Sequence, residues 1–479
     1  MKLSKLIEKV DVIKIKGDCD LIVNDITCDS KTITKNSLFF CIKGKDFDGH
    51  KYVREAEVYG AVAVVTEKEI PTKLTQIIVK DSREAMSVIS GNFYGNADKK
   101  MKIIGVTGTN GKTTTTNLIK SIIEKAGIPC GVIGTLGAYY LDKHVEPSLT
   151  TPDPIILHKI LADMYLEGVR IVVMEVSAHA IALKKVHGIT FEVGVFTNLT
   201  QDHLDYFGDM DSYAKTKLKF FDKRCKYIVT NSDDDLGLKI MKTCLGAISY
   251  GIKNPSDIFA MDVRCSEKNT TFLLNLFDEI YEVSTPLLGE FNVYNILAAV
   301  TVCSLLGIST DETVKNVQSV GCISGRMERV YDKDFSVFID YAHTPDGLLK
   351  SLTTLKSVCK GRIICVFGCG GNRDKSKRSV MGKISAENAD FTVITSDNPR
   401  FEEPMEIISE IEKGVLPVSK RYVIVQGRSE GIKYALGYAK KDDFVLIAGK
   451  GAENYQEILG IKHPYNDKDI VNEILREEK

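Results

Sequence analysis

Residues 102–119, KIIGVTGTNGKTTTTNLI, contain an apolar strand-like run, a loop with two glycines and the beginning of a helix. The backbone N–H groups of such a loop, together with the helix N-terminus, form a binding site for anions. Lys112 would reach the β- and γ-phosphates of a nucleotide, and the Thr113 hydroxyl would help to bind Mg²⁺. The sequence therefore predicts ATP or GTP binding. The predicted contacts are Gly108, Thr109, Asn110, Gly111, Lys112, Thr113 and Thr114.

The loop leaves one alternative open. Val106 occupies the usual position of the first glycine, and Gly108 follows two residues later. A glycine turn that joins a strand to a helix and binds no ligand has a similar sequence. The Gly-Lys-Thr at the start of the helix favours the phosphate-binding interpretation.

Strand-like runs alternate with helix-length segments along most of the chain. Besides the run before the loop, they are RIVVMEV (170–176), FEVGVFTNL (191–199), RIICVFG (362–368), DFTVITS (390–396) and DFVLIAG (443–449). Continuous Val and Ile runs separated by helices are typical of parallel sheets covered on both faces. The sequence therefore predicts an α/β fold.

Two changes in composition indicate domain boundaries. A polar, glycine-containing stretch at residues 92–102 precedes the phosphate-type loop, and a helical region ends in glycine before a new strand in residues 320–336. We predict three domains, at residues 1–98, 99–325 and 326–479.

The composition excludes several classes of protein. The net charge of −1 gives no basic field for nucleic acid, and no apolar run is long enough for a membrane helix. The N-terminus, MKLSKLIEKV, lacks the apolar core of a signal peptide. Twelve cysteines occur without a CxxC pair, which favours reduced thiols over disulfides or a zinc site. We expect a cytoplasmic protein that neither binds nucleic acid nor inserts into a membrane.

Polar residues follow two more of the predicted strands. Glu175 and Ser177 end one strand, and the next is followed by Asn198, Asp202, His203 and Asp205. Ligands of open parallel sheets bind beyond the carboxyl ends of the strands, so we expect these residues on the same edge as the loop. A histidine after a strand is often purely structural, but this placement favours function for Glu175 and His203, including Mg²⁺ binding.

Three lysines in SYAKTKLKFFDK, residues 212–223, are equivalent by composition. Lys215, Lys217 and Lys219 all fit a solvated helix face, and the pattern of the sequence does not single out one of them.

The last three strand-like runs end in GGNRD, DNPR and GKGAE. If these strands are neighbours in one parallel sheet, Arg373, Asn398, Arg400, Gly449 and Glu453 converge on one pocket. Two guanidinium groups, an amide and a carboxylate suit a small zwitterion that carries an extra carboxylate. The alternative is that Arg400 pairs at the surface with Glu402 or Glu403 of RFEEP.

Together, these motifs resemble those of the Mur ligases. The matching stretches are TGTNGKTTTT (107–116), MEVSAHA (174–180), FTNLTQDHLDYFGDM (196–210), GEFNVYNILAAV (289–300), GRMERV (325–330), DYAHTPD (340–346), FGCGGNRDKSKR (367–378) and SDNPR (396–400). They occur in the order of the family and span nearly the whole chain.

The resemblance implies three domains and an activity. The family has an N-terminal domain for the UDP end of the substrate, a central P-loop ATPase and a C-terminal Rossmann-like domain. The resemblance is strongest to the ligases that act on UDP-N-acetylmuramoyl-L-Ala-D-Glu in peptidoglycan precursor synthesis. ATP would first phosphorylate the D-glutamate carboxylate, and an incoming amine would then attack the acyl phosphate. ATP and Mg²⁺ are the implied cofactors, and we expect a monomer.

The resemblance also assigns roles to individual residues. Lys217 matches the family's carbamylated lysine and would bind a second Mg²⁺, so the implied metal ligands are Thr113, Glu175, His203 and carbamylated Lys217. The implied catalytic residues are Lys112, Glu175, His203 and Lys217. The implied contacts to the UDP-muramoyl dipeptide are Ser30, Thr150, Thr151, Ser177 and Lys185. Those to the nucleotide also include Asn292, Arg326, Asp340 and His343.

In the family, DNPR marks members that add meso-diaminopimelate, and lysine-adding members lack the arginine. Diaminopimelate has a second carboxylate at its far end, so a buried arginine left without it would disfavour lysine. The implied contacts are Arg373, Asp397, Asn398, Pro399, Arg400, Gly449 and Glu453.

The chain departs from the pattern of some relatives at three positions. Leu183 and Lys185 replace Gln and Arg, and Ala452 replaces a usual His. Three alternatives stay open: a ligase that adds L-lysine, a folylpolyglutamate-synthetase-like ligase, and a catalytically weak homologue that acts as a binding or scaffold subunit.

Overall fold

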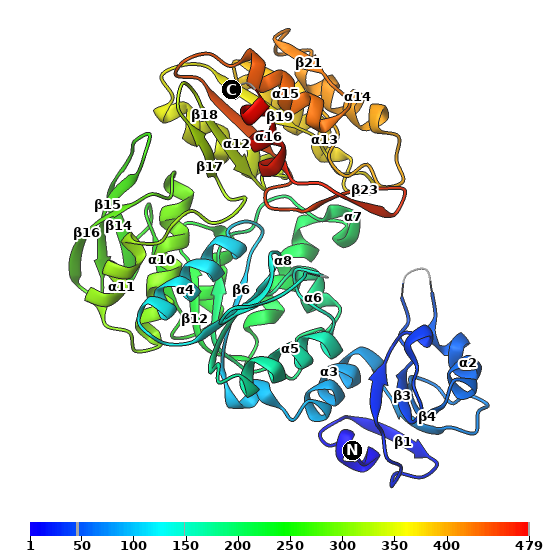
Figure 1. Cartoon of the computed structure of the whole chain (residues 1–479). Helices are drawn as coiled ribbons and strands as arrows, with labels where there is room; N and C mark the ends of the chain where they lie inside the picture. Colours follow the sequence, from blue (N-terminus) through cyan, green and yellow to red (C-terminus); the bar gives the residue numbers. More distant parts are fainter. Residues whose placement is uncertain (45–46, 148, 478–479) are drawn as a thin grey trace. The chain divides into compact units, whose positions relative to one another are not determined.

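A computed structural model of the protein describes residues 1–44, 47–147 and 149–477. Its contacts divide the chain into two compact units. Unit 1 comprises residues 1–107, 128–195 and 216–228, and unit 2 comprises residues 108–127, 196–215 and 229–479. Figure 1 shows the elements coloured along the chain.

Unit 1 begins with a five-stranded sheet in the order β1-β5-β4-β3-β2. β1 is antiparallel to β5 and the other pairs are parallel. The elements are α1 (Leu3–Leu6), β1 (Val12–Lys16), β2 (Asp25–Thr27), η1 (Ser30–Thr32), β3 (Ser37–Phe40), η2 (Gly49–Tyr52), α2 (Val53–Val58), β4 (Ala61–Thr66), β5 (Thr75–Val79), α3 (Ser82–Phe93) and η3 (Ala97–Lys100).

β3 contributes to two cores, because successive side chains of a strand point to opposite faces of the sheet. Leu38 and Phe40 of β3 pack into the core that contains residues of α1 and α3. Phe39, between them, packs on the opposite face with Val53 and Ala56 of α2.

Unit 1 continues with the strand order β12-β11-β6-β10-β7-β8-β9. β10 lies parallel to β6 and to β7, which brings Glu175 opposite Val106 at the carboxyl ends of β10 and β6. The elements that start in this part are β6 (Lys102–Thr107), β7 (Cys130–Gly134), β8 (Gly137–Tyr140), β9 (Lys143–Val145), α5 (Pro154–Leu166), β10 (Ile171–Glu175), α6 (Ala178–Ala182), β11 (Phe191–Phe196), η4 (Lys219–Phe221) and β12 (Cys225–Asn231).

β11 and β12 each continue into unit 2, where the sheet order is β12-β13-β14-β15-β16. The β14–β15 and β15–β16 pairs are antiparallel. The elements before the last sheet are α4 (Lys112–Lys125), α7 (Leu204–Phe207), α8 (Met210–Leu218), β13 (Ile248–Gly251), α9 (Asp235–Thr243), β14 (Ile258–Cys265), β15 (Thr270–Leu276), β16 (Glu279–Thr285), α10 (Glu290–Leu305) and α11 (Thr310–Gln318).

The last sheet of unit 2 has the order β17-β18-β22-β19-β20-β21 and is parallel except for β17. A separate hairpin, β23–β24, follows it. The elements are β17 (Glu328–Asp332), β18 (Ser336–Asp340), α12 (Pro345–Val358), β19 (Ile363–Phe367), α13 (Ser376–Asn388), β20 (Phe391–Ile394), α14 (Pro404–Val415), β21 (Tyr422–Ile424), α15 (Arg428–Tyr438), β22 (Phe444–Ala448), β23 (Tyr455–Ile458), β24 (Ile461–Pro464) and α16 (Asp467–Glu477).

Alternate residues of β19 enter different cores. Cys365 and Phe367 pack with residues of α12, α13 and α14. Ile364 and Val366 pack with residues of α15 and α16 on the other face. The predicted α/β fold with mostly parallel sheets is therefore confirmed, and β22, β19 and β20 are neighbours as predicted. Among the residues described, no helix is long and apolar enough to cross a membrane.

One fully buried ion pair joins α15 to α16. Arg428 donates from Nε and Nη2 to the two carboxylate oxygens of Asp467, at 2.8 and 2.7 Å. Both side chains are 0 % exposed. Burial opposes the charge of Arg428, but Asp467 raises its pKa, so the guanidinium stays ionised.

We expect Arg428→Met to lower the free energy of unfolding by about 3–5 kcal/mol, because it leaves the Asp467 carboxylate buried without its partner. Denaturant unfolding followed by circular dichroism would measure this. Lys215→Met is the control, since the Lys215–Asp211 pair is exposed and its loss should cost about 1 kcal/mol or less. Equal effects of both substitutions would contradict the prediction.

Candidate functional site

The predicted phosphate loop has the geometry of an anion-binding loop. Gly108 and Gly111 have φ angles of +153° and +85°, and a Cβ at Gly108 would lie 1.9 Å from Oγ1 of Thr197. Both positions therefore require glycine. Lys112, the first residue of α4, donates from Nζ to the carbonyl oxygens of Gly108 and Thr109, at 2.9 and 2.8 Å. The lysine thus lies over its own loop.

The segment after β11 supports this loop. Asn198 accepts a hydrogen bond from the backbone N–H of Asn110 at 3.0 Å, and its amide donates to the carbonyl oxygen of Asn110 at 3.1 Å. The Asn110 side chain donates to Asp346 of α12 at 2.8 Å and to Thr200 at 3.2 Å. Residues far apart in sequence therefore fix the conformation of Asn110.

Arg326 reaches the start of α4. Its Nη2 donates to Oγ1 of Thr113 at 2.7 Å, and its guanidinium lies 4.3 Å from the centre of the Tyr341 ring. Asp340 does not contact Arg326 directly, because its carboxylate accepts from the backbone N–H groups of Met327 and Tyr341 and from Ser351. Burial raises the pKa of Asp340. Asp340 therefore holds the turn that carries Arg326.

His203 and His343 both lie near Asp202. The Nε2 atoms are 3.3 and 3.9 Å from Oδ2 of Asp202. Desolvation by the surrounding protein, together with the Lys377 ammonium, lowers the pKa of His343 to about 4. Lys377 donates to the carbonyl oxygen of His343 at 2.8 Å. The predicted residues His203 and His343 are thus brought together, through an aspartate.

Asn295 of α10 lies beside Gly111 of the loop, and the sequence prediction missed it. A Cβ at Gly111 would lie 2.4 Å from Oδ1 of Asn295, which also accepts from Thr115 at 3.3 Å. The predicted residue Asn292 is one turn earlier on α10 and accepts from the Asn295 amide at 3.1 Å. The GEFNVYN motif contains both asparagines, but the spacing does not show which one faces the loop.

A second group of predicted residues lies in unit 1, at the carboxyl end of β10. Glu175 accepts from the backbone N–H of Thr135 at 2.8 Å and from its hydroxyl at 3.2 Å. The Thr135 hydroxyl is 3.1 Å from that of Thr150. Thr151 donates to the carbonyl oxygen of Glu175 at 2.8 Å and accepts from the backbone N–H of Ser177 at 3.1 Å.

Lys185 joins this group through the backbone of Thr151. It is buried, donates to the Thr151 carbonyl oxygen at 3.3 Å and pairs with Asp153 at 2.9 Å. Ser30 is not part of the group. It starts the short η1 helix beside the five-stranded sheet and is half-buried.

Lys217 differs from its neighbours in one respect that the sequence could not show. Its side chain is buried and its residue surface is 1 % exposed, whereas Lys215 and Lys219 are exposed. Within the described parts of the chain, no group of three or more His, Cys, Asp or Glu side chains is arranged to hold a metal ion.

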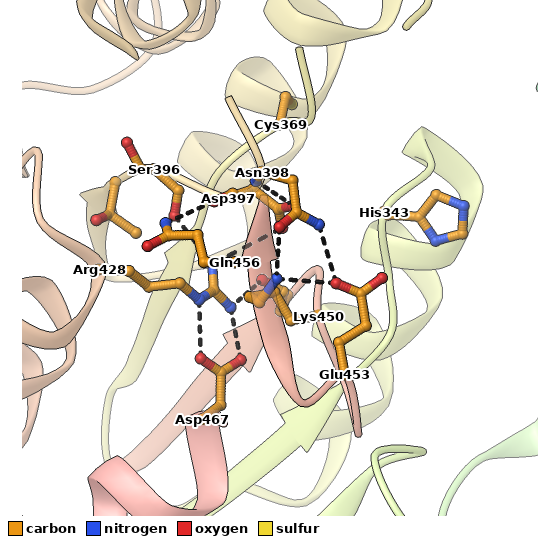
Figure 2. Close-up of polar contacts among 12 residues, drawn as sticks. His343, Cys369, Ser396, Asp397, Asn398, Arg428, Lys450, Glu453, Gln456 and Asp467 are labelled. Carbon is orange, nitrogen blue, oxygen red and sulfur yellow. Dashed lines mark hydrogen bonds and ion pairs between the residues drawn. The ribbon is translucent and has the colours of Figure 1, made fainter. Parts of the chain in front are cut away.

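The third group lies at the carboxyl ends of β19, β20 and β22. Asn398 donates to Glu453 at 2.9 Å, and a Cβ at Gly449 would lie 2.7 Å from Asp397. The Pro399 carbonyl accepts from the N–H of Glu402 at 3.0 Å. Figure 2 shows Asn398 and Glu453 pointing toward each other. The segments that follow β20 and β22 therefore meet in the structure.

The two predicted arginines differ in their surroundings. Arg400 has a φ of +53° and donates to Glu457 at 3.1 Å and to the carbonyl oxygen of Gly371 at 2.8 Å. A Cβ at Gly370 would lie 2.8 Å from Nη1 of Arg400 and 3.8 Å from Cγ of Arg373. Gly370 therefore separates the two side chains, and Arg373 is exposed.

The alternative pairing of Arg400 with Glu402 or Glu403 is wrong. Glu402 accepts instead from both terminal nitrogens of the buried Arg378, at 2.9 and 3.0 Å. These hydrogen bonds lower the pKa of Glu402 to about 2. Arg400 pairs instead with Glu457 of β23.

Three charged residues of the third group were not predicted. Lys450, Arg428 and Asp467 are all buried in or beside it. Lys450 stands inside the quoted GKGAE motif, but a lysine between two glycines gives no sequence signal of burial.

We expect Glu402→Gln to lower thermal stability most near neutral pH, and the difference from the parent protein to shrink as pH falls. A carboxylate with a lowered pKa contributes stability that is complete above its ordinary pKa of 4.5 and is lost as pH approaches about 2. Melting temperatures across this range would test the prediction. The exposed Glu403→Gln is the control, and a pH-independent effect of Glu402→Gln would contradict the assignment.

Three family models match the chain. They are the "Mur ligase family, catalytic domain" at residues 23–94, the "Mur ligase middle domain" at residues 106–303 and the "Mur ligase, glutamate ligase domain" at residues 325–451.

Similar proteins match along the full length. The chain is 43 % identical over 485 residues to "UDP-N-acetylmuramoyl-L-alanyl-D-glutamate--2,6-diaminopimelate ligase 1" of Clostridium acetobutylicum, with 100 % of both chains covered. A solved structure titled as a ligase of the same substrate pair is 31 % identical, with a TM-score of 0.71, and covers 100 % of this chain and 99 % of its own.

Folylpolyglutamate synthase of Mycobacterium tuberculosis shares the fold only in part. Its structure covers 76 % of this chain and 92 % of its own, at 17 % identity and a TM-score of 0.65. That likeness concerns the fold alone.

Proposed function

The chain belongs to the Mur ligase family, and on this premise we propose that it is an ATP-dependent ligase in peptidoglycan precursor synthesis. It joins meso-diaminopimelate to the D-glutamate of UDP-N-acetylmuramoyl-L-Ala-D-Glu. Full-length similarity to curated diaminopimelate ligases supports this choice over a folylpolyglutamate-synthetase-like enzyme, which lacks a counterpart for part of the chain.

One observation carries the choice of amino acid. Asn398 and Arg400 follow β20 and Glu453 follows β22, two strands that both pair with β19, and these side chains offer an amide, a guanidinium and a carboxylate. Asn398 donates to Glu453, and Arg400 donates to Glu457 and to the carbonyl oxygen of Gly371. Meso-diaminopimelate has an ammonium and a carboxylate at each end, so its far carboxylate pairs with Arg400 and its far ammonium with Glu453. L-lysine has no carboxylate there and leaves the guanidinium without a substrate partner.

The reaction has two steps. A carboxylate oxygen of D-glutamate attacks the γ-phosphorus of ATP, and the bond from that phosphorus to the β–γ bridging oxygen breaks to release ADP. The amine of diaminopimelate then attacks the acyl carbon, loses a proton, and inorganic phosphate leaves. Positioning and neutralisation of charge provide most of the catalysis in such transfers, which is consistent with a site built from Lys112 and backbone donors.

The nucleotide lies on the phosphate loop. The backbone of Gly108–Gly111 and the Lys112 ammonium hold its phosphates. Asn295 lies beside Gly111, and Arg326 donates to the Thr113 hydroxyl at the start of α4. In the structure, the Lys112 ammonium donates hydrogen bonds to two carbonyl oxygens of the loop. When ATP binds, phosphate oxygens replace these carbonyls as its acceptors.

Magnesium suits the oxygen donors that the family resemblance implies. The Thr113 hydroxyl and the Glu175 carboxylate are hard oxygen ligands of the kind that Mg²⁺ prefers, and a carbamate on Lys217 would add another. The ion neutralises phosphate charge when bound. Thr113 and His203 belong to unit 2 and Glu175 and Lys217 to unit 1, so the shared metal role of these four residues stays a prediction.

The burial of Lys217 distinguishes it from the exposed Lys215 and Lys219 and supports the choice of this lysine for carbamylation. Thr150, Thr151, Ser177 and Lys185 contact the muramoyl dipeptide, and Ser30 contacts the uridine end.

The enzyme acts in the cytoplasm as a monomer. It has three domains with the predicted boundaries, and the three matched segments support this division.

The proposal is tested by phosphate release from ATP in the presence of UDP-N-acetylmuramoyl-L-Ala-D-Glu. We expect turnover with meso-diaminopimelate and little with L-lysine, and hydroxamate formation when hydroxylamine replaces the amino acid. Equal turnover with both amino acids would contradict the role given to Arg400, and none with either would contradict the ligase assignment.

We expect Arg400→Met to lower kcat/KM for meso-diaminopimelate about a hundredfold, because the second carboxylate loses a charge-assisted partner. The KM for ATP should change less than about twofold, since Arg400 does not contact the phosphate loop. Steady-state kinetics with each substrate varied would measure this. The control is Arg421→Met, because Arg421 is exposed and directly precedes β21 at the edge of the same sheet. A parallel loss for all three substrates would indicate misfolding instead of lost recognition.

A further inference from the structure

Lys450 is a fully buried lysine whose ammonium bonds Asn398 and Glu453, two residues of the proposed amino-acid site. It follows β22 between two glycines with positive φ angles, Gly449 and Gly451, and is 0 % exposed. Its Nζ donates to Oδ1 of Asn398 at 2.9 Å and to Oε2 of Glu453 at 2.8 Å. The rings of Tyr455 and Tyr465 lie 5.6 and 5.9 Å from the same nitrogen. Figure 2 shows the ammonium between the Asn398 and Glu453 side chains.

These contacts fix which way the Asn398 amide points. Its Oδ1 accepts from Lys450 and from the backbone N–H of Glu457 at 2.9 Å, so two donors occupy its two lone pairs. Its Nδ2 donates to Oε2 of Glu453. A flipped amide would direct N–H groups at an ammonium and at a backbone N–H, which is unfavourable. The flipped orientation is therefore excluded while Lys450 is present.

Lys450 also determines which oxygen of Glu453 is open to a ligand. Oε2 accepts two hydrogen bonds, from Lys450 and from Asn398. Within residues 1–44, 47–147 and 149–477, no group hydrogen-bonds Oε1. The side chain is 20 % exposed, so Oε1 is the atom that a substrate ammonium can reach.

Asp397, which directly precedes Asn398 after β20, has its own buried contacts. The Asp397 carbonyl accepts from Gln456 at 2.7 Å, and the Asp397 carboxylate lies 3.9 Å from the buried Arg428. Burial opposes its ionisation, but Lys450 and Arg428 lower the pKa of Asp397, so it is charged. Lys450 therefore balances a local excess of carboxylates as well as orienting its two partners.

We propose that Lys450 is a positioning residue for amino-acid selection, which orients Asn398 and Glu453 toward the ammonium and carboxylate at the far end of the incoming amino acid. This inference rests on the proposed function, because it assigns those two side chains to the amino-acid pocket. Lys450 itself does not touch the substrate, since it is enclosed by its protein partners.

The test compares Lys450→Met and Lys450→Gln in the full-length enzyme, with the KM values of meso-diaminopimelate, ATP and the UDP-dipeptide measured separately. Met removes the charge and all donors at similar length, and Gln keeps one donor for Asn398. The control is Lys468→Met, which removes an ion pair with Glu328 in the same part of unit 2 but touches neither Asn398 nor Glu453. Melting temperatures are recorded for every variant.

We expect Lys450→Met to raise the KM for meso-diaminopimelate about tenfold or more, with kcat and the other two KM values within about twofold. Lys450→Gln should lie between the parent enzyme and Lys450→Met, and Lys468→Met should match the parent. A lowered melting temperature with unchanged or uniformly changed KM values would overturn the proposal in favour of a purely structural role. So would failure of both Lys450 variants to fold.

If the parent enzyme does not turn over meso-diaminopimelate, the proposed function is wrong and Lys450 has no amino acid to select. If the parent enzyme is active and Lys450→Met shows parent-like KM values, the function stands and the role of Lys450 is wrong.

Discussion

The parallel pairing of neighbouring strands is the constraint on which the positions of the site residues depend. Because β18, β22, β19 and β20 run in one direction, their carboxyl ends lie at one edge of the sheet. Residues separated by some fifty positions in sequence, such as Asn398 and Glu453, thereby come within hydrogen-bond distance. In the same way, the parallel pairing of β10 with β6 brings Glu175, the last residue of β10, opposite Val106. The sheets bury both faces, so their edges are the places where polar side chains can gather.

The sequence was most informative where a residue type has one physical use. Glycine at 108 and 111 and lysine at 112 allow few interpretations, and in the structure they form a loop at the start of α4. Continuous Val and Ile runs likewise indicated the buried parallel strands correctly.

Other features could not be predicted because they depend on what lies around a side chain. Lys217 is buried and Lys215 is exposed, yet the two have the same neighbours in composition. Glu402 pairs with Arg378, which lies on a different helix from the one that follows Arg400. Asn295 is distinguished from Asn292 only by the turn of α10 that faces Gly111. Tertiary packing decides each of these cases.

Arg400 is held by the β23–β24 hairpin as much as by its own strand. Its backbone N–H donates to Glu457 and its carbonyl accepts from Leu459, while its side chain pairs with Glu457. The hairpin thus holds the backbone of Arg400 in its left-handed conformation. Any substitution at Arg400 therefore also removes the guanidinium partner of Glu457 and changes a contact between two segments, DNPR and the hairpin.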